Sequence, residues 1–268
     1  MEDDVSIVQS YYDENVPMEW ERLQAHPFEF RITSAMMARY IHPGDRVLDI
    51  GGGPGRYALH LAQMGCDVTL VDLSPANAAF AQAKAKELGA PLTALSGDAR
   101  SVDAMGLGAF DHVLLMGPLY HLLEEEERVR AVNAALACLR PGGKLYASFI
   151  LMFAGMIYGM KFMPAMVLDA DEQRFIDCVL QDSSFSGAAF TQAHFISQKE
   201  ILPFMARFPL KKLHLLGQEG ILSPCEQNLL AQSPAVVDRW VELAVQLCER
   251  EELLAYSEHA LYIGEKQA

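Results

Sequence analysis

The stretch Val47-Leu-Asp-Ile-Gly-Gly-Gly-Pro-Gly55 determines the fold that the sequence predicts. Residues 46–50 form a short apolar run typical of a buried strand, and residues 57–64 predict a helix. Between them, glycines at alternate positions let the backbone adopt positive φ angles or lie against a ligand. The free N–H groups at the start of the helix add hydrogen-bond donors at the same place. The sequence therefore predicts a ligand-binding turn between a strand and a helix.

The spacing of these glycines distinguishes two kinds of nucleotide-binding turn. A dinucleotide fingerprint has the pattern GxGxxG, in which the last glycine lets the helix pack closely on the strand. Counted from Gly51, that glycine would fall at position 56, which is Arg56. The pattern is instead DxGxGxG beginning at Asp49, which disfavours a nicotinamide-dependent oxidoreductase.

Short apolar segments alternate with helical segments along the rest of the chain. After residue 50, strands are expected at 67–71, 92–95, 110–116, 144–150, 212–217 and 259–263. Helices are expected at 75–88, behind the start signal Ser74-Pro75, at 124–139, and at 228–254 with an interruption at Pro234. Ser197-Gln-Lys-Glu200 is a capping-box pattern that predicts one more short helix. The alternation predicts an α/β fold: a Rossmann-like, seven-stranded, mostly parallel sheet with helices on both faces.

With these elements placed, the chain resembles the class I S-adenosylmethionine-dependent methyltransferases. The glycine stretch resembles their first motif, and further motifs match in order over roughly residues 40–150. They are Val71-Asp72-Leu73-Ser74 after the second strand, Gly97-Asp98-Ala99 after the third, 110–116 as the fourth, and 139–144 before the fifth. Four ordered motifs on the corresponding elements make the resemblance specific. It implies S-adenosylmethionine as the cofactor.

The resemblance also implies which residues bind that cofactor. Asp72 would accept hydrogen bonds from the ribose hydroxyls, and Asp98 would accept one from the adenine amino group. In the alternative interpretation Asp72 only caps the next helix, although Ser74 already supplies that cap. Asp49 could equally hydrogen-bond within its own turn. The expected cofactor-binding residues are Asp49, Gly51, Gly52, Gly53, Asp72, Leu73, Asp98, Ala99 and Met116.

The methyl acceptor is expected next to Gly117-Pro118-Leu119-Tyr120-His121-Leu122, at the carboxyl end of the fourth strand, where open α/β sheets bind ligands. This segment resembles a signature of a bacterial subgroup of small methyltransferases. His121 is the candidate general base, because the unperturbed pKa of histidine suits neutral pH. The alternative is a histidine that only shapes the pocket. Tyr120 is the second catalytic candidate, with a role as pocket wall favoured over one as catalyst.

Residues 1–40 predict one or two helices that pack on the domain and resemble a lid over the donor. Tyr11, Tyr12 and Trp20 are its candidate substrate-binding residues, and Arg22 could contact the carboxylate of the donor. Ordinary amphipathic packing is the alternative for each of them. His194 is a weaker candidate on the acceptor side.

The apolar stretch 149–168 has the length of a bilayer span. Its start is the fifth strand, Lys161 and Pro164 interrupt the rest, and acidic residues follow it without a positive flank. A strand that continues into a buried cap helix is the preferred interpretation. The segment lies in an interval of about 60 residues before the next expected strand, and insertions of that length are often functional. Met156 and Met160 are therefore expected to bind a small, apolar or aromatic substrate, with core packing as the alternative.

The composition restricts the remaining choices. With 51% hydrophobic residues and a formal net charge of −14, the chain is expected to be globular and to lack the basic face that nucleic acid requires. Five widely spaced cysteines indicate neither a disulfide framework nor a metal site, and a cytoplasmic location is expected. No membrane partner is expected.

Together these features predict four segments: an N-terminal helical lid (1–40), a Rossmann-like core that binds S-adenosylmethionine (41–150), a cap inserted over the acceptor site (151–200), and a part that completes the sheet (201–268). The expected function is an S-adenosylmethionine-dependent methyltransferase with a small-molecule acceptor. The alternatives are a methyltransferase-fold protein that acts on RNA or protein, and a non-catalytic protein that binds S-adenosylmethionine or a nucleoside.

Overall fold

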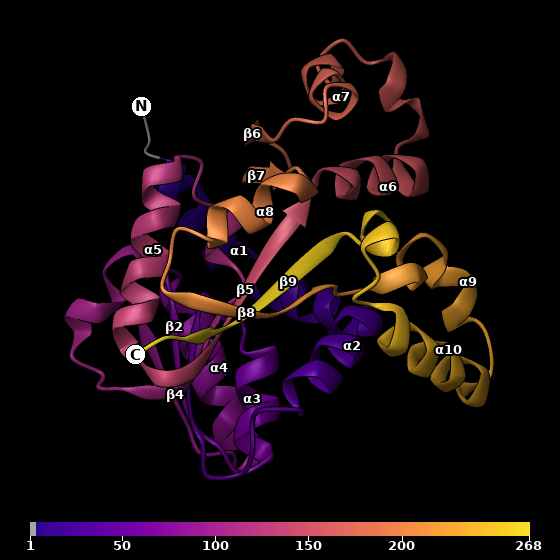
Figure 1. Cartoon of the computed structure of the whole chain (residues 1–268). Helices are drawn as coiled ribbons and strands as arrows, with labels where there is room; N and C mark the ends of the chain where they lie inside the picture. The colour runs from indigo at the N-terminus through magenta and orange to yellow at the C-terminus, as the bar shows by residue number, and fades with distance from the viewer. Residues whose placement is uncertain (1–3) are drawn as a thin grey trace.

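The computed structural model describes residues 4–268, and within these residues nine strands form one sheet (Figure 1). The strands are β1 (Arg46–Ile50), β2 (Asp67–Asp72), β3 (Leu92–Ser96), β4 (Phe110–Leu115), β5 (Leu139–Leu151), β6 (Phe185–Ala188), β7 (Gln192–Ile196), β8 (Leu210–Gly217) and β9 (His259–Lys266). Their order is β3-β2-β1-β4-β5-β7-β6, and β9 pairs with both β5 and β8. The first five strands are mutually parallel, whereas β9 runs antiparallel to β5 and β8. The predicted α/β fold is confirmed, with nine strands in place of seven.

Helices cover both faces of the sheet. They are α1 (Asp4–Ala25), α2 (Pro27–Met37), α3 (Arg56–Gln63), α4 (Pro75–Leu88), α5 (Glu125–Cys138), α6 (Met152–Phe162), α7 (Gln173–Leu180), α8 (Gln198–Met205), α9 (Glu226–Leu230) and α10 (Pro234–Leu247). Short 3₁₀ helices are η1 (Ala99–Met105), η2 (Pro118–Tyr120), η3 (Pro164–Leu168), η4 (Gly220–Cys225) and η5 (Glu251–Tyr256). One buried apolar cluster lies between the sheet and α5, η1 and α8, and a second between the sheet and α2, α3, α4 and α10. Successive residues of β1 alternate between them, since Val47 belongs to the second cluster and Leu48 to the first.

Two helix starts illustrate how far local signals determine structure. Ser74 caps α4 as predicted, because its Oγ accepts a hydrogen bond from the Asn77 backbone N–H at 3.0 Å. Ser197 precedes α8, but the predicted capping box is wrong. The Ser197 hydroxyl donates to Asp182, and the Glu200 carboxylate accepts from the Ser184 hydroxyl. The turn at 182–184 therefore supplies partners that compete with the box.

The insertion after β5 is helical over α6 and α7, and it also holds the hairpin β6–β7, which adds two strands to the sheet. Figure 1 shows α6 and α7 projecting from the rest of the molecule beyond the end of β5. The expectation of a buried helix after β5 holds for one face of α6 only, because the side chains of Phe153, Tyr158 and Met160 are exposed. No helix among the described residues is long and apolar enough to cross a membrane.

Strand β7 lies beyond the end of β4, on the same side of β5. Strand β4 pairs with β5 as far as Leu115 and Ala147, whereas β5 continues to Leu151. Strand β7 pairs with the extension at Ile150 and Leu151, while β9 occupies the other side of β5 there. The hairpin therefore forms a wall at the edge where β1, β2 and β4 end, which we call the carboxyl edge. The same edge holds the glycine turn and the segment 117–122.

Candidate active site at the carboxyl edge

The glycine turn after β1 packs directly on the segment after β4. Gly51 has a φ of +69°, and a Cβ atom there would lie 2.5 Å from the Pro118 side chain. A Cβ at Gly117 would lie 2.7 Å from the Gly51 carbonyl oxygen. Gly53 has a φ of +56°, but the position of its absent Cβ faces open space. The turn is thus closed on the side of η2 and open at Gly53, where a ligand can approach the backbone.

Asp49 presents an unsatisfied carboxylate behind this turn. The residue is 3% exposed, and its Oδ2 atom has no hydrogen-bond partner among the described residues. Burial, followed by repulsion from the nearby Asp72, raises its pKa to about 7. A buried carboxylate oxygen without a donor fits a positively charged group of a ligand, such as the ammonium of an amino acid.

Asp72 lies at the end of β2 and binds backbone and side-chain groups of the glycine turn and of the start of α4. Its Oδ2 accepts from the Gly53 backbone N–H at 2.8 Å, and its Oδ1 accepts from Ser74 N–H and the Asn77 amide. Burial raises its pKa in spite of these bonds. Asp72 therefore connects the glycine turn to α4, and its Oδ2 can still accept a ligand hydroxyl through its remaining lone pair.

Asp98 has a partner that the sequence analysis did not consider. Its carboxylate accepts from the Arg100 backbone N–H at 2.8 Å and from the Arg100 guanidinium at 2.6 Å, and Arg100 also pairs with Glu127. Burial raises the pKa of Asp98, but the bonds from Arg100 outweigh it and the pKa is lowered. A contact with adenine must compete with Arg100, so the role of Asp98 stays a prediction. Leu73, Ala99 and Met116 are partly buried beside the same edge.

Helix α1 lies over the site through two hydrogen-bonded residues. The Asp13 carboxylate accepts from the Ser74 hydroxyl at 2.5 Å and from the Ala76 backbone N–H at 3.2 Å. The Tyr12 hydroxyl lies 2.9 Å from His121 Nε2, and Tyr11 packs edge-on against Tyr12. The segment therefore contacts both the start of α4, on the expected donor side, and His121, on the expected acceptor side.

Trp20 and Arg22 lie farther along α1. The Trp20 ring packs against Phe80 of α4, with ring centroids 5.6 Å apart, as ordinary packing would require. The Arg22 guanidinium forms two hydrogen bonds of 2.7 Å with Glu19 and is largely exposed. The suggested contact between Arg22 and the donor carboxylate would have to replace that pair.

His121 is held in one tautomer by its two partners. Its Nδ1 lies 3.1 Å from the Gln192 carbonyl oxygen, which can only accept, so Nδ1 carries the hydrogen. Its Nε2 then accepts from the Tyr12 hydroxyl. Burial lowers the pKa of His121 to about 4, so the ring is neutral at neutral pH and weakly basic. Tyr120 donates its hydroxyl to the Met116 carbonyl at 2.8 Å, and burial raises its pKa.

The contact between Tyr12 and His121 leads to a prediction about helix α1. Tyr12→Phe removes the hydroxyl that bonds to His121 and should lower the free energy of unfolding by about 1 kcal/mol. Hydrogen exchange of the amides in α1 should become faster, because the helix loses its hydrogen bond to His121. Tyr11→Phe is the matched control, because its hydroxyl makes no hydrogen bond with residues 4–268. Equal exchange in both variants would contradict the assigned role of Tyr12.

The cap residues separate into two groups. Met156 packs against the buried cluster of α6, α7 and the hairpin, whereas the Met160 side chain is 68% exposed. Met160 faces solvent because it lies on the outer face of α6, so its predicted contact with substrate would require a different position of the cap.

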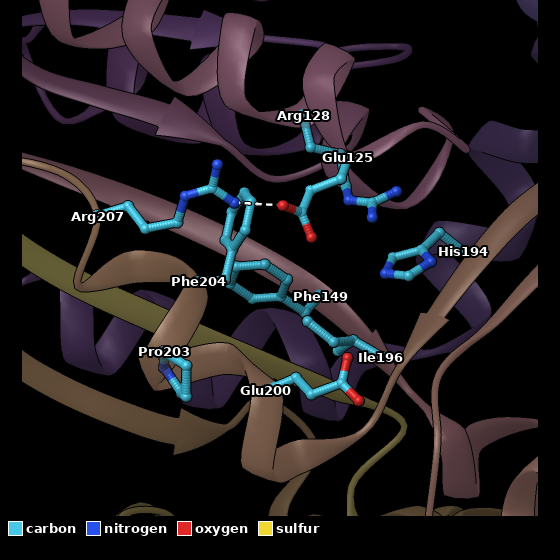
Figure 2. A pocket seen from close by; sticks show the side chains of 9 residues that line it. All are labelled: Glu125, Arg128, Phe149, His194, Ile196, Glu200, Pro203, Phe204 and Arg207. Atoms are coloured by element: carbon cyan, nitrogen blue, oxygen red, sulfur yellow. Dashed lines mark hydrogen bonds and ion pairs between the residues drawn. The ribbon is translucent and has the colours of Figure 1, made fainter.

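His194 lines a cavity of about 260 Å³ on the side of α5 and α8 (Figure 2). Its Nδ1 lies 2.8 Å from the Ser186 hydroxyl, and burial lowers its pKa to about 3. Figure 2 shows the Arg207–Glu125 ion pair and Arg128 beside it. His121 and the other predicted site residues do not line this cavity.

A cluster of ionisable residues at the same edge was missed by the sequence analysis. His259, at the start of β9, lies with its ring centroid 6.1 Å from that of Tyr120, and Glu219, after β8, bonds to it. Glu29 of α2 accepts from the Tyr57 hydroxyl at 2.5 Å and from the Gln218 amide at 2.8 Å. One signal was available: the end of one strand and the start of its antiparallel partner lie at the same edge of a sheet.

Comparisons with known proteins match residues 47–143 to a family and the whole chain to a fold. A family model described as "Methyltransferase domain" matches residues 47–143. The chain is 31% identical over 135 residues to a ubiquinone biosynthesis O-methyltransferase of Xanthomonas axonopodis pv. citri, covering 47% of this chain and 55% of that protein. A similar match to the protein of that name from Xanthomonas campestris pv. campestris is 30% identical. The chain spans about half the length of these curated relatives.

Two solved structures share the architecture of almost the whole chain. Magnesium protoporphyrin IX methyltransferase of Synechocystis, solved with S-adenosylhomocysteine, has a TM-score of 0.60 and 17% identity and covers 99% of this chain and 100% of its own. The 1,6-didemethyltoxoflavin-N1-methyltransferase of Burkholderia thailandensis has a TM-score of 0.61 and 14% identity, with 98% and 88% coverage. Residues 47–143 thus match the methyltransferase domain family, and the chain has the fold of the class I S-adenosylmethionine-dependent methyltransferases.

Proposed function

We propose that this protein transfers a methyl group from S-adenosylmethionine to a small-molecule acceptor. The observation that carries the proposal is the pairing of an open backbone position at Gly53 with the unpartnered Asp49 Oδ2 atom, inside a segment that matches methyltransferase domains. When bound, the cofactor supplies a methyl group already activated on a sulfonium. Gly51–Gly53 would lie along its methionine part, Asp49 would face the ammonium, and Asp72 would accept from the ribose.

The protein's own contribution is to align the acceptor and exclude water, because an activated methyl group needs little further chemistry. Helix α1 covers the site through contacts of Tyr12 with His121 and of Asp13 with Ser74. The hairpin β6–β7 forms one wall of the site. The similarity to O-methyltransferases supports an oxygen as the accepting atom. The sequence of residues 117–122 supports a place in the subgroup with the Gly-Pro-Leu-Tyr-His-Leu segment.

The acceptor is expected to be uncharged overall or weakly charged. The net charge of −14 and the carboxylates Glu19, Glu29 and Glu219 around Tyr120 disfavour RNA or another polyanion. Aromatic rings from Tyr12, Tyr120 and Phe190 surround His121 and favour a planar or apolar acceptor.

Thermal and chemical unfolding with S-adenosylhomocysteine tests the donor assignment. At about 100 times its dissociation constant, a ligand that binds only the folded state adds about 2.7 kcal/mol to the free energy of unfolding. The wild-type protein should show this gain, whereas NAD should give none. Asp72→Asn should abolish most of it, because the amide replaces an acceptor that faces three N–H groups.

Asp67→Asn is the matched control, since Asp67 lies at the other end of β2 and is exposed. It should keep the full response. Stabilisation by NAD alone, or an undiminished response of Asp72→Asn, would contradict the proposal. Binding of S-adenosylhomocysteine without turnover of any acceptor would favour a non-catalytic binding protein.

A further inference from the structure

The carboxylate of Glu219 is fixed by four hydrogen bonds. It accepts from His259 Nδ1 at 2.6 Å and from the Ser257 hydroxyl at 2.7 Å. It also accepts from the backbone N–H groups of Glu258 at 3.0 Å and His259 at 2.9 Å. Burial alone would raise the pKa of Glu219, but the charge of His259 and these bonds lower it. Glu219 is therefore an ionised group held in one orientation.

His259 is oriented by this carboxylate. Because Glu219 accepts from Nδ1, that atom carries a hydrogen and Nε2 is the ring nitrogen left for another partner. No described residue hydrogen-bonds to Nε2, and the side chain of His259 is 27% exposed. The residue opens β9 opposite Ile150, at the carboxyl edge, beside the ring of Tyr120.

The groups that face His259 come from several elements. Burial lowers its pKa, but the carboxylates of Glu219, Glu29 and Glu258 outweigh burial and raise it. Glu29 lies on α2, and Glu258 is paired with Lys161 of α6 at 2.9 Å. Tyr120, on η2, is the neighbouring ionisable group on the side of the glycine turn. The surroundings therefore make His259 a stronger base than an ordinary histidine, in contrast to His121.

His121 and His259 are thus suited to different tasks. Both ring nitrogens of His121 are occupied, and burial makes it a weak base. His259 has one free nitrogen and a carboxylate behind the other, which is the arrangement that orients and stabilises an imidazolium. The sequence analysis placed the general base at His121, and the geometry favours His259.

We propose that His259 and Glu219 form a dyad that removes the proton from a phenolic hydroxyl of the acceptor; this rests on the proposed function. The hydroxyl proton passes to His259 Nε2 while an oxygen lone pair forms the new O–C bond to the methyl group. The C–S bond breaks, and its electron pair stays on sulfur as the thioether of S-adenosylhomocysteine. Glu219 stabilises the imidazolium, which loses its proton to solvent after the product leaves.

The test compares two acceptors that differ in acidity. Catechol is protonated at neutral pH, whereas 4-nitrocatechol is largely ionised at slightly alkaline pH and needs no base. His259→Gln keeps a donor for Glu219 but cannot accept the proton as imidazole does. It should lower kcat/KM for catechol about 100-fold or more, the usual contribution of a general base, while turnover of 4-nitrocatechol changes little.

Glu219→Gln provides a readout that a purely structural role would not give. Without the carboxylate, the pKa of His259 should fall, so the acidic limb of the pH profile for catechol should move to lower pH with a lower maximum. Glu249→Gln is the matched control, because it breaks another histidine–glutamate pair, His214–Glu249 at 2.5 Å, away from the carboxyl edge. It should leave the profile and both rates unchanged.

The outcomes separate the dyad from the proposed function. Equal losses for both acceptors in His259→Gln, or an unchanged rate with catechol, would overturn the dyad. A wild-type protein stabilised by S-adenosylhomocysteine that methylates neither catechol would also overturn the dyad and leave donor binding intact. Absence of any response to S-adenosylhomocysteine would instead overturn the proposed function itself.

Discussion

Gly51→Ala is expected to lower the free energy of unfolding by about 2–5 kcal/mol, from the sum of two penalties. A side chain at a φ of +69° costs about 1–2 kcal/mol in backbone strain. The added methyl would also lie 2.5 Å from the Pro118 ring, and overpacking of this kind costs about 1–3 kcal/mol. Because Pro118 opens η2, its displacement would also move Tyr120 and His121. Urea unfolding measures the change, and the same variant should lose most of its response to S-adenosylhomocysteine.

Gly106→Ala separates the two penalties. Gly106 has nearly the same φ, +68°, but a Cβ there meets no atom within 4 Å. This variant should show the backbone penalty alone and bind S-adenosylhomocysteine normally. If Gly51→Ala and Gly106→Ala unfold at the same urea concentration, the close contact between Gly51 and Pro118 adds no penalty, which would contradict the tight packing of the glycine turn on Pro118.

Asp49→Asn is expected to stabilise the ligand-free protein above pH 7. Burial and the neighbouring Asp72 raise the pKa of Asp49 from 3.8 to about 7. A carboxylate whose pKa is raised by folding stabilises the protein below its unfolded pKa and loses that contribution as the pH rises through the folded pKa. At 1.36 kcal/mol per pKa unit, the difference between variant and wild type should grow by roughly 4 kcal/mol between about pH 4 and pH 7 and stay constant above it.

Chemical unfolding across this range measures the difference, and Asp103→Asn is the control, because Asp103 is an exposed carboxylate on η1. The control should follow the wild type at every pH. Asp49→Asn should bind S-adenosylhomocysteine less tightly even where it is the more stable protein, since it no longer offers a charge to the ammonium. A difference that does not change with pH would contradict the raised pKa of Asp49.

The core of the fold was predictable because its signals are local. The apolar runs of β1 to β5 and the Ser74-Pro75 start of α4 lie within a few residues of what they determine, and the structure confirms them. The hairpin β6–β7 was not predictable. Its pairing depends on the extension of β5 past the end of β4, which no pattern within 185–196 reveals. The exposed face of α6 was missed for a related reason, because a wholly apolar helix shows no periodicity.

The site divides in the same way. Asp49, Gly51, Gly53 and Asp72 carry a motif, and the structure places them around one turn. The contact between Tyr12 and His121 joins residues 109 positions apart, and that between Glu219 and His259 joins residues 40 apart. Neither pair has a sequence spacing that reports the contact. The sequence could identify His121 and Tyr12 separately as candidates. It could not show that the Tyr12 hydroxyl forms a hydrogen bond with His121 Nε2.

The position of β9 has a consequence for how the molecule assembles. This strand follows every other strand in the chain, yet it lies between β5 and β8 and pairs with both. During synthesis, β5 and β8 therefore leave the ribosome without the partner that joins them, and the backbone groups of both strands that face β9 stay unpaired until residues 259–266 emerge. Long-range pairing of this kind is slow to form and exposes edges to aggregation. The nascent chain completes its sheet and gains His259 in the same late step.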